Sequence, residues 1–171
     1  MFCMAIWLAG TAFIAIIATQ NFYTIDRLLT DSPSGVFRHA ADTMTSSPTV
    51  RELLRYLSSE LNRLYFQMWN VAQLVLGIIA IWLIARSDKD ERASLQPATR
   101  GVIVMLGIVV LMLVYLTPAI VSLGRSLDFV ARDPAPPGMR RFWILHAAYT
   151  SLEMIKLLIG GFVAVKLLRR T

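Results

Sequence analysis

The chain has 171 residues, of which 56% are hydrophobic and only 16% charged, and its formal net charge is +6 at pH 7. A typical soluble domain is about 25% charged, and a soluble chain of this length could not bury so much apolar surface in one core. The single cysteine, Cys3, excludes a disulfide within the chain and a cysteine-rich metal site. The composition therefore indicates one integral membrane domain that covers residues 1–171.

Four apolar runs predict transmembrane helices, because each is near the length of about 20 residues that crosses the hydrocarbon core of a bilayer. They are residues 2–20, 64–85, 101–123 and 142–165. The first run could instead be a signal peptide, but it lacks a positive n-region and is long for an h-region, so we expect a retained helix. The predicted fold is all-α, an integral membrane four-helix bundle.

Residues 21–62 form a predicted interfacial and extramembrane segment. After the turn signal "DSPSG", apolar residues at helical spacing predict a short amphipathic helix on the membrane surface. These residues are Val36, Phe37, Ala40, Ala41 and Met44. Thr49 and Glu52 have the spacing of a capping box, so the second helix is expected to begin near Thr49 and to continue to about Ala85. Such a helix is about 55 Å long and extends beyond the bilayer.

Two polar links join the later helices, namely a charged loop at 86–100 and a proline-rich link at 124–141. Pro118 predicts a kink or the end of the third helix. The density of Lys and Arg in the first link and the C-terminal tail favours cytoplasmic termini in a bacterial inner membrane, although Arg140 and Arg141 argue for the reverse. Because basic residues lie mainly in loops and at helix ends, we expect contacts with membrane lipids and not with nucleic acid.

The last apolar run carries a polar stripe. It consists of His146, Tyr149, Glu153, Lys156 and Gly160, which follow one another in steps of three and four and so share one helix face. Glu153 lies about 18 Å along the helix from Arg141, near mid-membrane, where a lone charge costs at least about 2.5–3.5 kcal/mol. Lys156 is one turn further and can neutralise it. The stripe must therefore face protein or water, because lipid cannot solvate it.

The second helix carries a matching seam of Asn70, Gln73 and Gly77, and we expect this seam to meet the stripe. The resulting intramembrane polar network has three interpretations. The favoured one is internal hydrogen bonding that fixes the register of the helices. The second is a proton or ion relay through Glu153 and His146. The third is a site for haem, chlorophyll or quinone, in which His146, and for a second haem ligand His39, would bind the metal.

The sequence constrains the fold of the protein more than it constrains the function. The chain has none of the motifs GxGxxG, HExxH, CxxC and GxSxG and no Walker loop, and its links are too short to form a catalytic domain. We expect a non-catalytic accessory or structural subunit of a larger membrane complex, electron-transfer or photosynthetic, with protein partners and with lipid or pigment contacts. The alternative is a small transporter of ions, protons or solutes that uses Glu153 at mid-membrane.

Three stretches, "AIWLAGTAFIAI", "ELNRLYFQMWNVAQLVLG" and "RFWILHAAYTSLEMIK", carry a family resemblance. They resemble the small four-span bacterial membrane proteins of unknown function that are grouped as transmembrane-protein-205-like. The matching positions are Trp7 with Gly10, Asn62 or Asn70, and Phe142 with His146. The resemblance implies a four-helix bundle without known catalysis.

Overall fold

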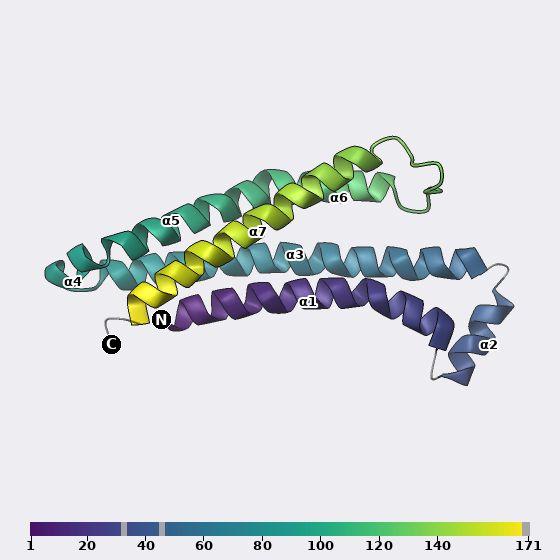
Figure 1. The fold of residues 1–171 in the computed structure, drawn as a ribbon, viewed down its shortest axis with the longest axis horizontal. Helices are drawn as coiled ribbons and strands as arrows, with labels where there is room; N and C mark the ends of the chain where they lie inside the picture. Colours follow the sequence, from purple (N-terminus) through teal and green to yellow (C-terminus); the bar gives the residue numbers. More distant parts are fainter. Residues whose placement is uncertain (32–33, 45–46, 169–171) are drawn as a thin grey trace.

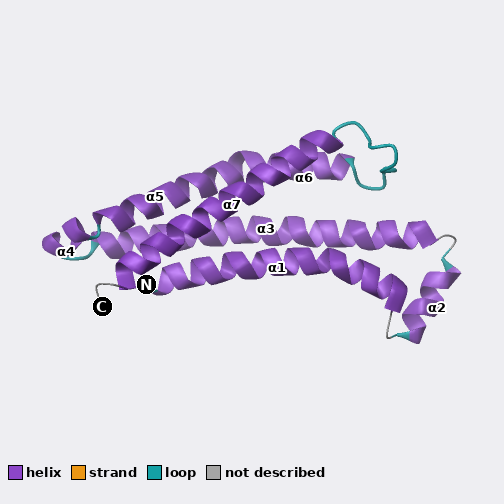
Figure 2. Cartoon of the chain, viewed as in Figure 1, coloured by secondary structure: helices purple, strands orange, loops and turns teal. Residues whose placement is uncertain are grey.

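The computed structural model describes residues 1–31, 34–44 and 47–168, and every regular element in these ranges is helical. The elements are α1 (Phe2–Asp31), α2 (Gly35–Thr43), α3 (Ser47–Ala85), α4 (Lys89–Ser94), α5 (Gln96–Leu111), the π-helical turn η1 (Met112–Leu116), α6 (Thr117–Ser126) and α7 (Met139–Leu168). Figure 2 shows that their connections are short, except for the loop between α6 and α7. The prediction of an all-α chain is confirmed for the described residues.

Within the described ranges, three helical stretches are long and apolar enough to cross a membrane. They are Phe2–Asp31, Thr49–Ala85 and Gln96–Ser126, and the last runs through α5, η1 and α6. They contain the first three predicted spans. The remaining long helix, α7, has 30 residues and packs along α5 and α1 (Figure 1). The assignment of α7 as a fourth span stays a prediction.

The first helix does not end near residue 20 as predicted, because α1 continues to Asp31. No glycine or proline interrupts residues 21–31, and polar groups there find partners on α3. The Asn21 side chain donates from Nδ2 to Asn62 Oδ1 (2.7 Å), and Ser58 Oγ donates to the Asn21 carbonyl (3.3 Å). Much of the predicted extramembrane segment is therefore regular helix that belongs to α1 and α3.

The short helix α2 occupies the predicted amphipathic segment. Its start is capped by Ser34, whose side chain accepts a hydrogen bond from the backbone N–H of Phe37 at 3.2 Å. None of its residues is buried, so α2 keeps an apolar edge uncovered, and its placement on a membrane surface stays a prediction. The helix that follows, α3, has 39 residues and is the extended second helix that the sequence predicts.

Pro118 does not end the third helix, which passes it by way of a π-helical turn. A proline lacks an N–H group, and its ring meets the carbonyl four residues earlier, here that of Val114. The turn η1 lies directly before Thr117 and Pro118, and such widened turns are one way in which a helix accommodates the missing hydrogen bond. The predicted span 101–123 therefore extends in the structure over Gln96–Ser126.

The link at 86–100, predicted as a loop, contains the short helix α4. Arg92, in the last turn of α4, donates from Nη2 to the backbone carbonyl of Ala85 and, at 3.4 Å, to that of Ser87. The last carbonyls of an α-helix have no partner within the helix. Arg92 therefore satisfies the C-terminal end of α3 and holds the link against it.

The helices pack closely at one end of the molecule and diverge at the other (Figure 1). The close end contains the start of α1 and the end of α7, and its core consists of Met4, Trp7, Ala80, Ala98, Val102, Met105, Val109 and Val163. Toward the α6–α7 loop, the pair of α6 and α7 separates from the pair of α1 and α3. The interior there is lined by a smaller cluster of Met112, Leu116 and Tyr149.

Two glycines permit the contacts at the close end. A Cβ atom on Gly10 would lie 2.1 Å from Cη2 of Trp69, and one on Gly160 would lie 2.8 Å from Cδ2 of Leu8. Trp69 can therefore cover α1, and α7 can approach α1, only because these positions carry no side chain.

Candidate functional site

The polar stripe of α7 faces the interior over most of its length. Tyr149, Glu153, Lys156 and Gly160 are buried, whereas Leu158, on the opposite side of the helix, is 75% exposed. The steps of three and four residues place the buried set on one face. That face is covered by α1 and α5 and by polar side chains of α3.

Lys156 is the centre of the buried polar contacts and is only 1% exposed. Its Nζ donates to Glu153 Oε1 at 2.9 Å and to Gln73 Oε1 at 2.6 Å. The indole Nε1–H of Trp7 donates to the same Gln73 oxygen at 2.8 Å. One amide oxygen thus joins α1, α3 and α7, and the ammonium charge is compensated by a carboxylate one turn away.

A second set of hydrogen bonds lies one to two turns nearer the α6–α7 loop. Tyr149 donates from its hydroxyl to Asn70 Oδ1 at 3.3 Å, and Asn70 Nδ2 donates to Thr117 Oγ1 at 2.9 Å. These bonds join α7, α3 and α6. The structure therefore brings five residues of the predicted network together in two groups, Asn70 with Tyr149, and Gln73 with Glu153 and Lys156.

Two atoms in these groups have no hydrogen-bond partner among the described residues. They are Nε2 of Gln73 and Oε2 of Glu153, and both are buried. Buried polar atoms are usually satisfied, and these two are the exceptions among the described residues.

His146 departs from the prediction that it joins the polar network. It is exposed overall, and its side chain makes no hydrogen bond within the described part of the chain. Its ring stacks on Phe142 with a centroid distance of 6.0 Å and meets Trp143 edge-on at 6.0 Å. His146 lies at the point where the α7 face leaves the packed core, so it lines a cavity instead of a hydrogen-bonded layer.

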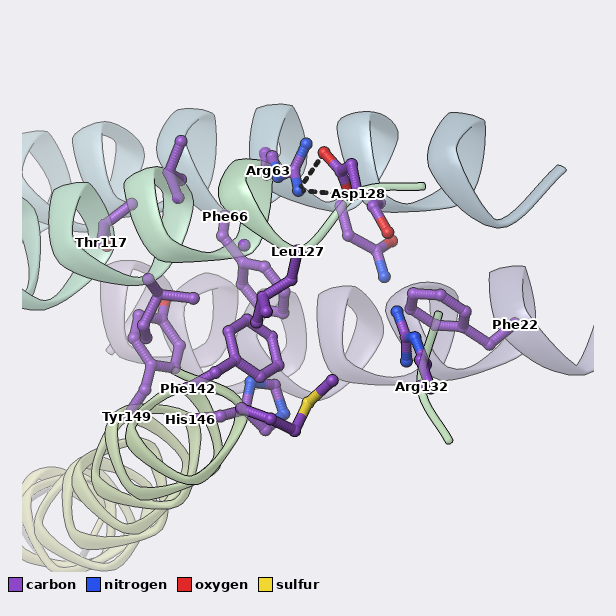
Figure 3. Close-up of a pocket in the computed structure, with 16 residues that line it drawn as sticks. Phe22, Arg63, Phe66, Thr117, Leu127, Asp128, Arg132, Phe142, His146 and Tyr149 are labelled. Atoms are coloured by element: carbon purple, nitrogen blue, oxygen red, sulfur yellow. Dashed lines mark hydrogen bonds and ion pairs between the residues drawn. The ribbon is translucent and has the colours of Figure 1, made fainter. Parts of the chain in front are cut away.

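A cavity of about 130 Å³ occupies the space where the two helix pairs diverge. Its apolar walls include Phe22, Phe66, Ile120, Leu127, Met139 and Phe142, and its polar lining includes Asn62, Arg63, Thr117, Asp128, Arg132, His146 and Tyr149. Figure 3 shows Tyr149, His146 and Phe142 on one side and the Arg63–Asp128 pair on the other. Because Tyr149 and Thr117 also belong to the Asn70 contacts, the cavity extends as far as the buried polar residues.

The size of the cavity limits what His146 could ligate in this conformation. An apolar cavity of about 150 Å³ holds one benzene molecule, so the space beside His146 accepts a single ring or a short length of chain, and a porphyrin would require the helices to move apart. His39 lies exposed on α2 and does not line the cavity. The structure therefore does not bring the two histidines together as a pair of haem ligands.

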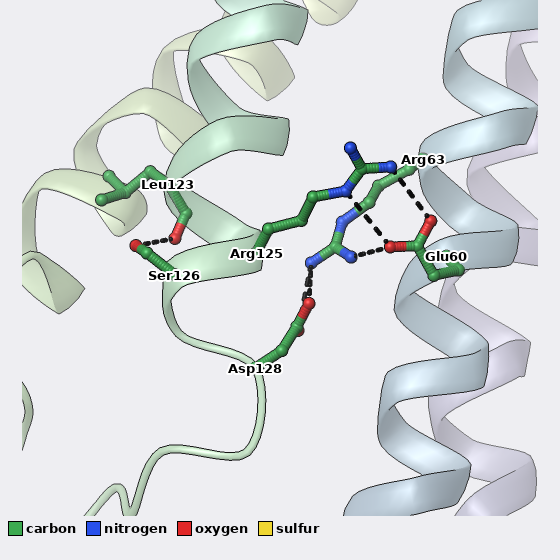
Figure 4. Close-up of polar contacts among 6 residues, drawn as sticks. All are labelled: Glu60, Arg63, Leu123, Arg125, Ser126 and Asp128. Carbon is green, nitrogen blue, oxygen red and sulfur yellow. Dashed lines mark hydrogen bonds and ion pairs between the residues drawn. The ribbon is translucent and has the colours of Figure 1, made fainter.

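Ion pairs hold the α6–α7 loop against α3 at the cavity's outer end (Figure 4). Arg63 pairs with Glu60 and, at 2.9 Å, with Asp128 of the loop. Arg125 of α6 contacts the same Glu60 carboxylate at 3.4 Å. Because a Cβ on Gly124 would lie 3.1 Å from Nη2 of Arg63, the glycine leaves room for this arginine to reach the loop.

Several of these contacts were not predicted from the sequence. The indole of Trp7 and the hydroxyl of Thr117 lie in apolar runs without a polar pattern around them. The one general signal available for Trp7 is that a buried indole N–H usually has an acceptor. The ion pair between Arg63 and Asp128 joins residues far apart in the sequence, so no local spacing indicates it.

No family model, curated protein or solved structure matches the chain. The resemblance to the transmembrane-protein-205-like proteins therefore stays a prediction, and the chain's own geometry carries the functional inference.

Proposed function

We propose that the protein is a non-catalytic integral membrane protein with four spans, α7 being the fourth, and that it serves as an accessory or structural subunit of a larger membrane complex. The observation that carries the proposal is the pairing of Lys156 with Glu153 and Gln73. Lys156 joins α7 to α3 through Gln73, its pairing with Glu153 neutralises both charges within α7, and none of these three residues lines the cavity. Such contacts hold a bundle together without performing chemistry on a substrate.

The burial of these charges supports a membrane-crossing α7. With Glu153 and Lys156 turned inward, the opposite face of α7 offers lipid an apolar surface, represented by Met154, Leu158 and Phe162. The helix is as long as α1. Four crossings also agree with the start of α1 and the end of α7 lying at the same end (Figure 1), which we place on the cytoplasmic side of a bacterial inner membrane.

Large apolar side chains on several outer faces support a role among membrane partners. Phe13 on α1, Val114 on η1 and Leu158 on α7 are each more than half exposed. Acyl chains can cover such faces, and so can the helices of other subunits or bound pigments.

Photo-crosslinking in native membranes tests the accessory role. A crosslinking amino acid at Phe13, Val114 or Leu158 should yield adducts with another protein from at least one face, and gently solubilised protein should migrate as part of a larger assembly. The same amino acid at Val109, which is fully buried, provides the control and should crosslink only within the chain. A lone monomer with lipid adducts at all three outer positions would contradict the role.

A specific observation favours transport as the second candidate. Glu153 Oε2 lacks a partner among the described residues, and Tyr149, one turn before Glu153, lines the cavity. A proton or small cation could enter from the cavity past Tyr149 to this carboxylate.

Proteoliposomes provide the test of transport. If Glu153 carries the transported species, the wild-type protein conducts protons or cations and the variant Glu153→Gln, which keeps the shape of the side chain, does not. Wild-type vesicles without flux, or unchanged flux in the variant, would exclude this function. Gel filtration of both proteins shows whether the variant remains folded.

A further inference from the structure

One cation at the cavity is left without a counter-ion. Arg63 is held by Glu60 and Asp128, and Arg125 is held by Glu60. Arg132 also lines the cavity, yet it forms no ion pair or hydrogen bond with any described residue. The cavity lining therefore carries an unmatched positive charge.

Arg132 is exposed to solvent, and the positive charges around it favour the approach of an anion. Desolvation lowers the pKa of its guanidinium, Arg55 lowers it further, and Asp128 and Glu52 only partly oppose them. An arginine remains charged under these conditions. A phosphate or carboxylate that approached Arg132 would be attracted by both arginines and could accept two parallel hydrogen bonds from the guanidinium.

The loop that carries Arg132 is held in place over the cavity. Asp128 is tied to Arg63 at 2.9 Å, and the next residue, Phe129, has φ of 59° and packs on Tyr56 with ring centroids 5.2 Å apart. Few residues other than glycine adopt such a φ, so the backbone direction after Phe129 is set by these contacts. Arg132 and Phe22 both line the cavity, and Figure 3 shows Arg132 apart from the Arg63–Asp128 pair.

The rest of the cavity is suited to hydrocarbon. Phe66, Ile120 and Phe142 line the cavity together with Arg132 and Tyr149. Figure 3 shows Phe142 between Arg132 and Tyr149. The volume of about 130 Å³ accepts a short length of an acyl chain, with the remainder outside among lipid. A charged head near the loop and a chain directed toward the middle of the bundle match the way in which a lipid lies in a leaflet.

We propose that this cavity binds an anionic lipid, with its phosphate or carboxylate on Arg132 and part of one acyl chain between Phe66 and Phe142. The site rests on the membrane location of the protein and not on its role as a subunit, so a failure of either proposal leaves the other intact. Zwitterionic lipids should bind more weakly. The positive group of such a headgroup neutralises the phosphate of the same lipid, and Arg55 and Arg132 repel it.

Photo-crosslinkable lipids test the site in the full-length protein. Phosphatidylglycerol and phosphatidylcholine with the same diazirine-bearing chain are compared in nanodiscs, and the labelled peptides are mapped by mass spectrometry. We expect phosphatidylglycerol to label the peptides of α6 and α7 that line the cavity, in roughly tenfold excess over phosphatidylcholine, as loss of one charge-assisted contact implies. Oleate with the same diazirine forms a third arm; stronger labelling by oleate than by phosphatidylglycerol identifies a free carboxylate as the natural head.

Matched variants separate the head and chain subsites. Arg132→Gln should reduce phosphatidylglycerol labelling to the phosphatidylcholine level, whereas Arg140→Gln, at the same end but outside the cavity lining, should not. Val121 lines the cavity, so Val121→Phe fills it and should block labelling there. Val110→Phe, on an outer face, should not. Three outcomes would overturn the proposal: equal labelling by the two phospholipids in the wild-type protein, adducts confined to outer faces, or an equal loss of labelling in Arg140→Gln. The first two are measured on the wild-type protein, so they remain decisive if a variant fails to fold.

Discussion

Two groups of charged residues in this protein have similar chemistry and opposite surroundings. Lys156 and Glu153 lie in the middle of the bundle, where the lysine side chain is 1% exposed. Glu60 and Arg125 lie at the diverging end, where the arginine side chain is 62% exposed. Away from water a charge requires a fixed partner, so the inner pair determines which face of α7 points inward. Near water a charge needs no such partner. The outer pairs can therefore hold the α6–α7 loop against α3 while Arg132 stays without an ion-pair partner among the described residues.

The comparison predicts that removal of one inner charge has the largest effect. Lys156→Met leaves the Glu153 carboxylate buried without its counter-ion, and the expected loss is about 3–5 kcal/mol of the free energy of unfolding. Denaturant unfolding in mixed micelles measures it. The double variant Lys156→Met/Glu153→Leu, which removes both charges, should recover most of the loss. A single variant as stable as the wild-type protein would show that the pair is hydrated and not buried.

Close packing at the tight end predicts an intermediate effect. Gly10→Ala forces the Trp69 ring to move, because the new Cβ would lie 2.1 Å from it, and overpacking of this kind costs about 1–3 kcal/mol. Gly107→Ala is the matched control, because nothing lies within 4 Å of its Cβ position. It should be neutral or gain about 0.5–1 kcal/mol in helix stability. Equal thermal midpoints for both variants would contradict the observed contact between α1 and Trp69.

The outer charges should have the smallest effect and the strongest salt dependence. Arg125→Gln removes an exposed contact with Glu60 and should lower the stability less than either variant above, because water screens this pair. Added salt screens exposed pairs, so the difference from the wild-type protein should disappear at about 1 M, while the effect of Lys156→Met should persist. Parallel unfolding curves at low and high salt check this, and a salt-independent loss for Arg125→Gln would mean that the outer pairs are also shielded from water.

The sequence was most informative where a regular pattern and a strong physical penalty act together. Steps of three and four residues, combined with the cost of an unpaired charge in lipid, were enough to predict that Glu153 and Lys156 turn toward α3. The same reasoning does not indicate that His146 lines the cavity, because the helix face it shares with Tyr149 leaves the core within one turn. Helical periodicity predicts which face of a helix a side chain lies on. It does not predict where a neighbouring helix diverges from that face.

Such patterns do not predict where the helices end or where the cavity lies. The polar residues after Gln20 predict a connection between helices. In the structure, Asn21 and Ser58 instead stabilise a longer α1 by contacts between α1 and α3. The cavity depends on the divergence of α6 and α7 from α1 and α3, which is a property of the whole assembly. Pro118 was correctly recognised as an irregularity, but the form of the irregularity, a π-helical turn, depends on the surrounding packing.

We propose that α7 crosses the membrane with its polar stripe turned toward the other helices, and spin labelling of single cysteines can check this orientation. In a Cys3→Ser background, labels replace Met154 and Leu158, which are 51% and 75% exposed, and Tyr149 and Val163, which are buried. Labels at the first two positions should collide frequently with oxygen and rarely with a water-soluble nickel complex. Labels at the other two positions should collide little with either. Access of the nickel complex to residues 154 and 158, or equal oxygen access on both faces, would contradict this orientation.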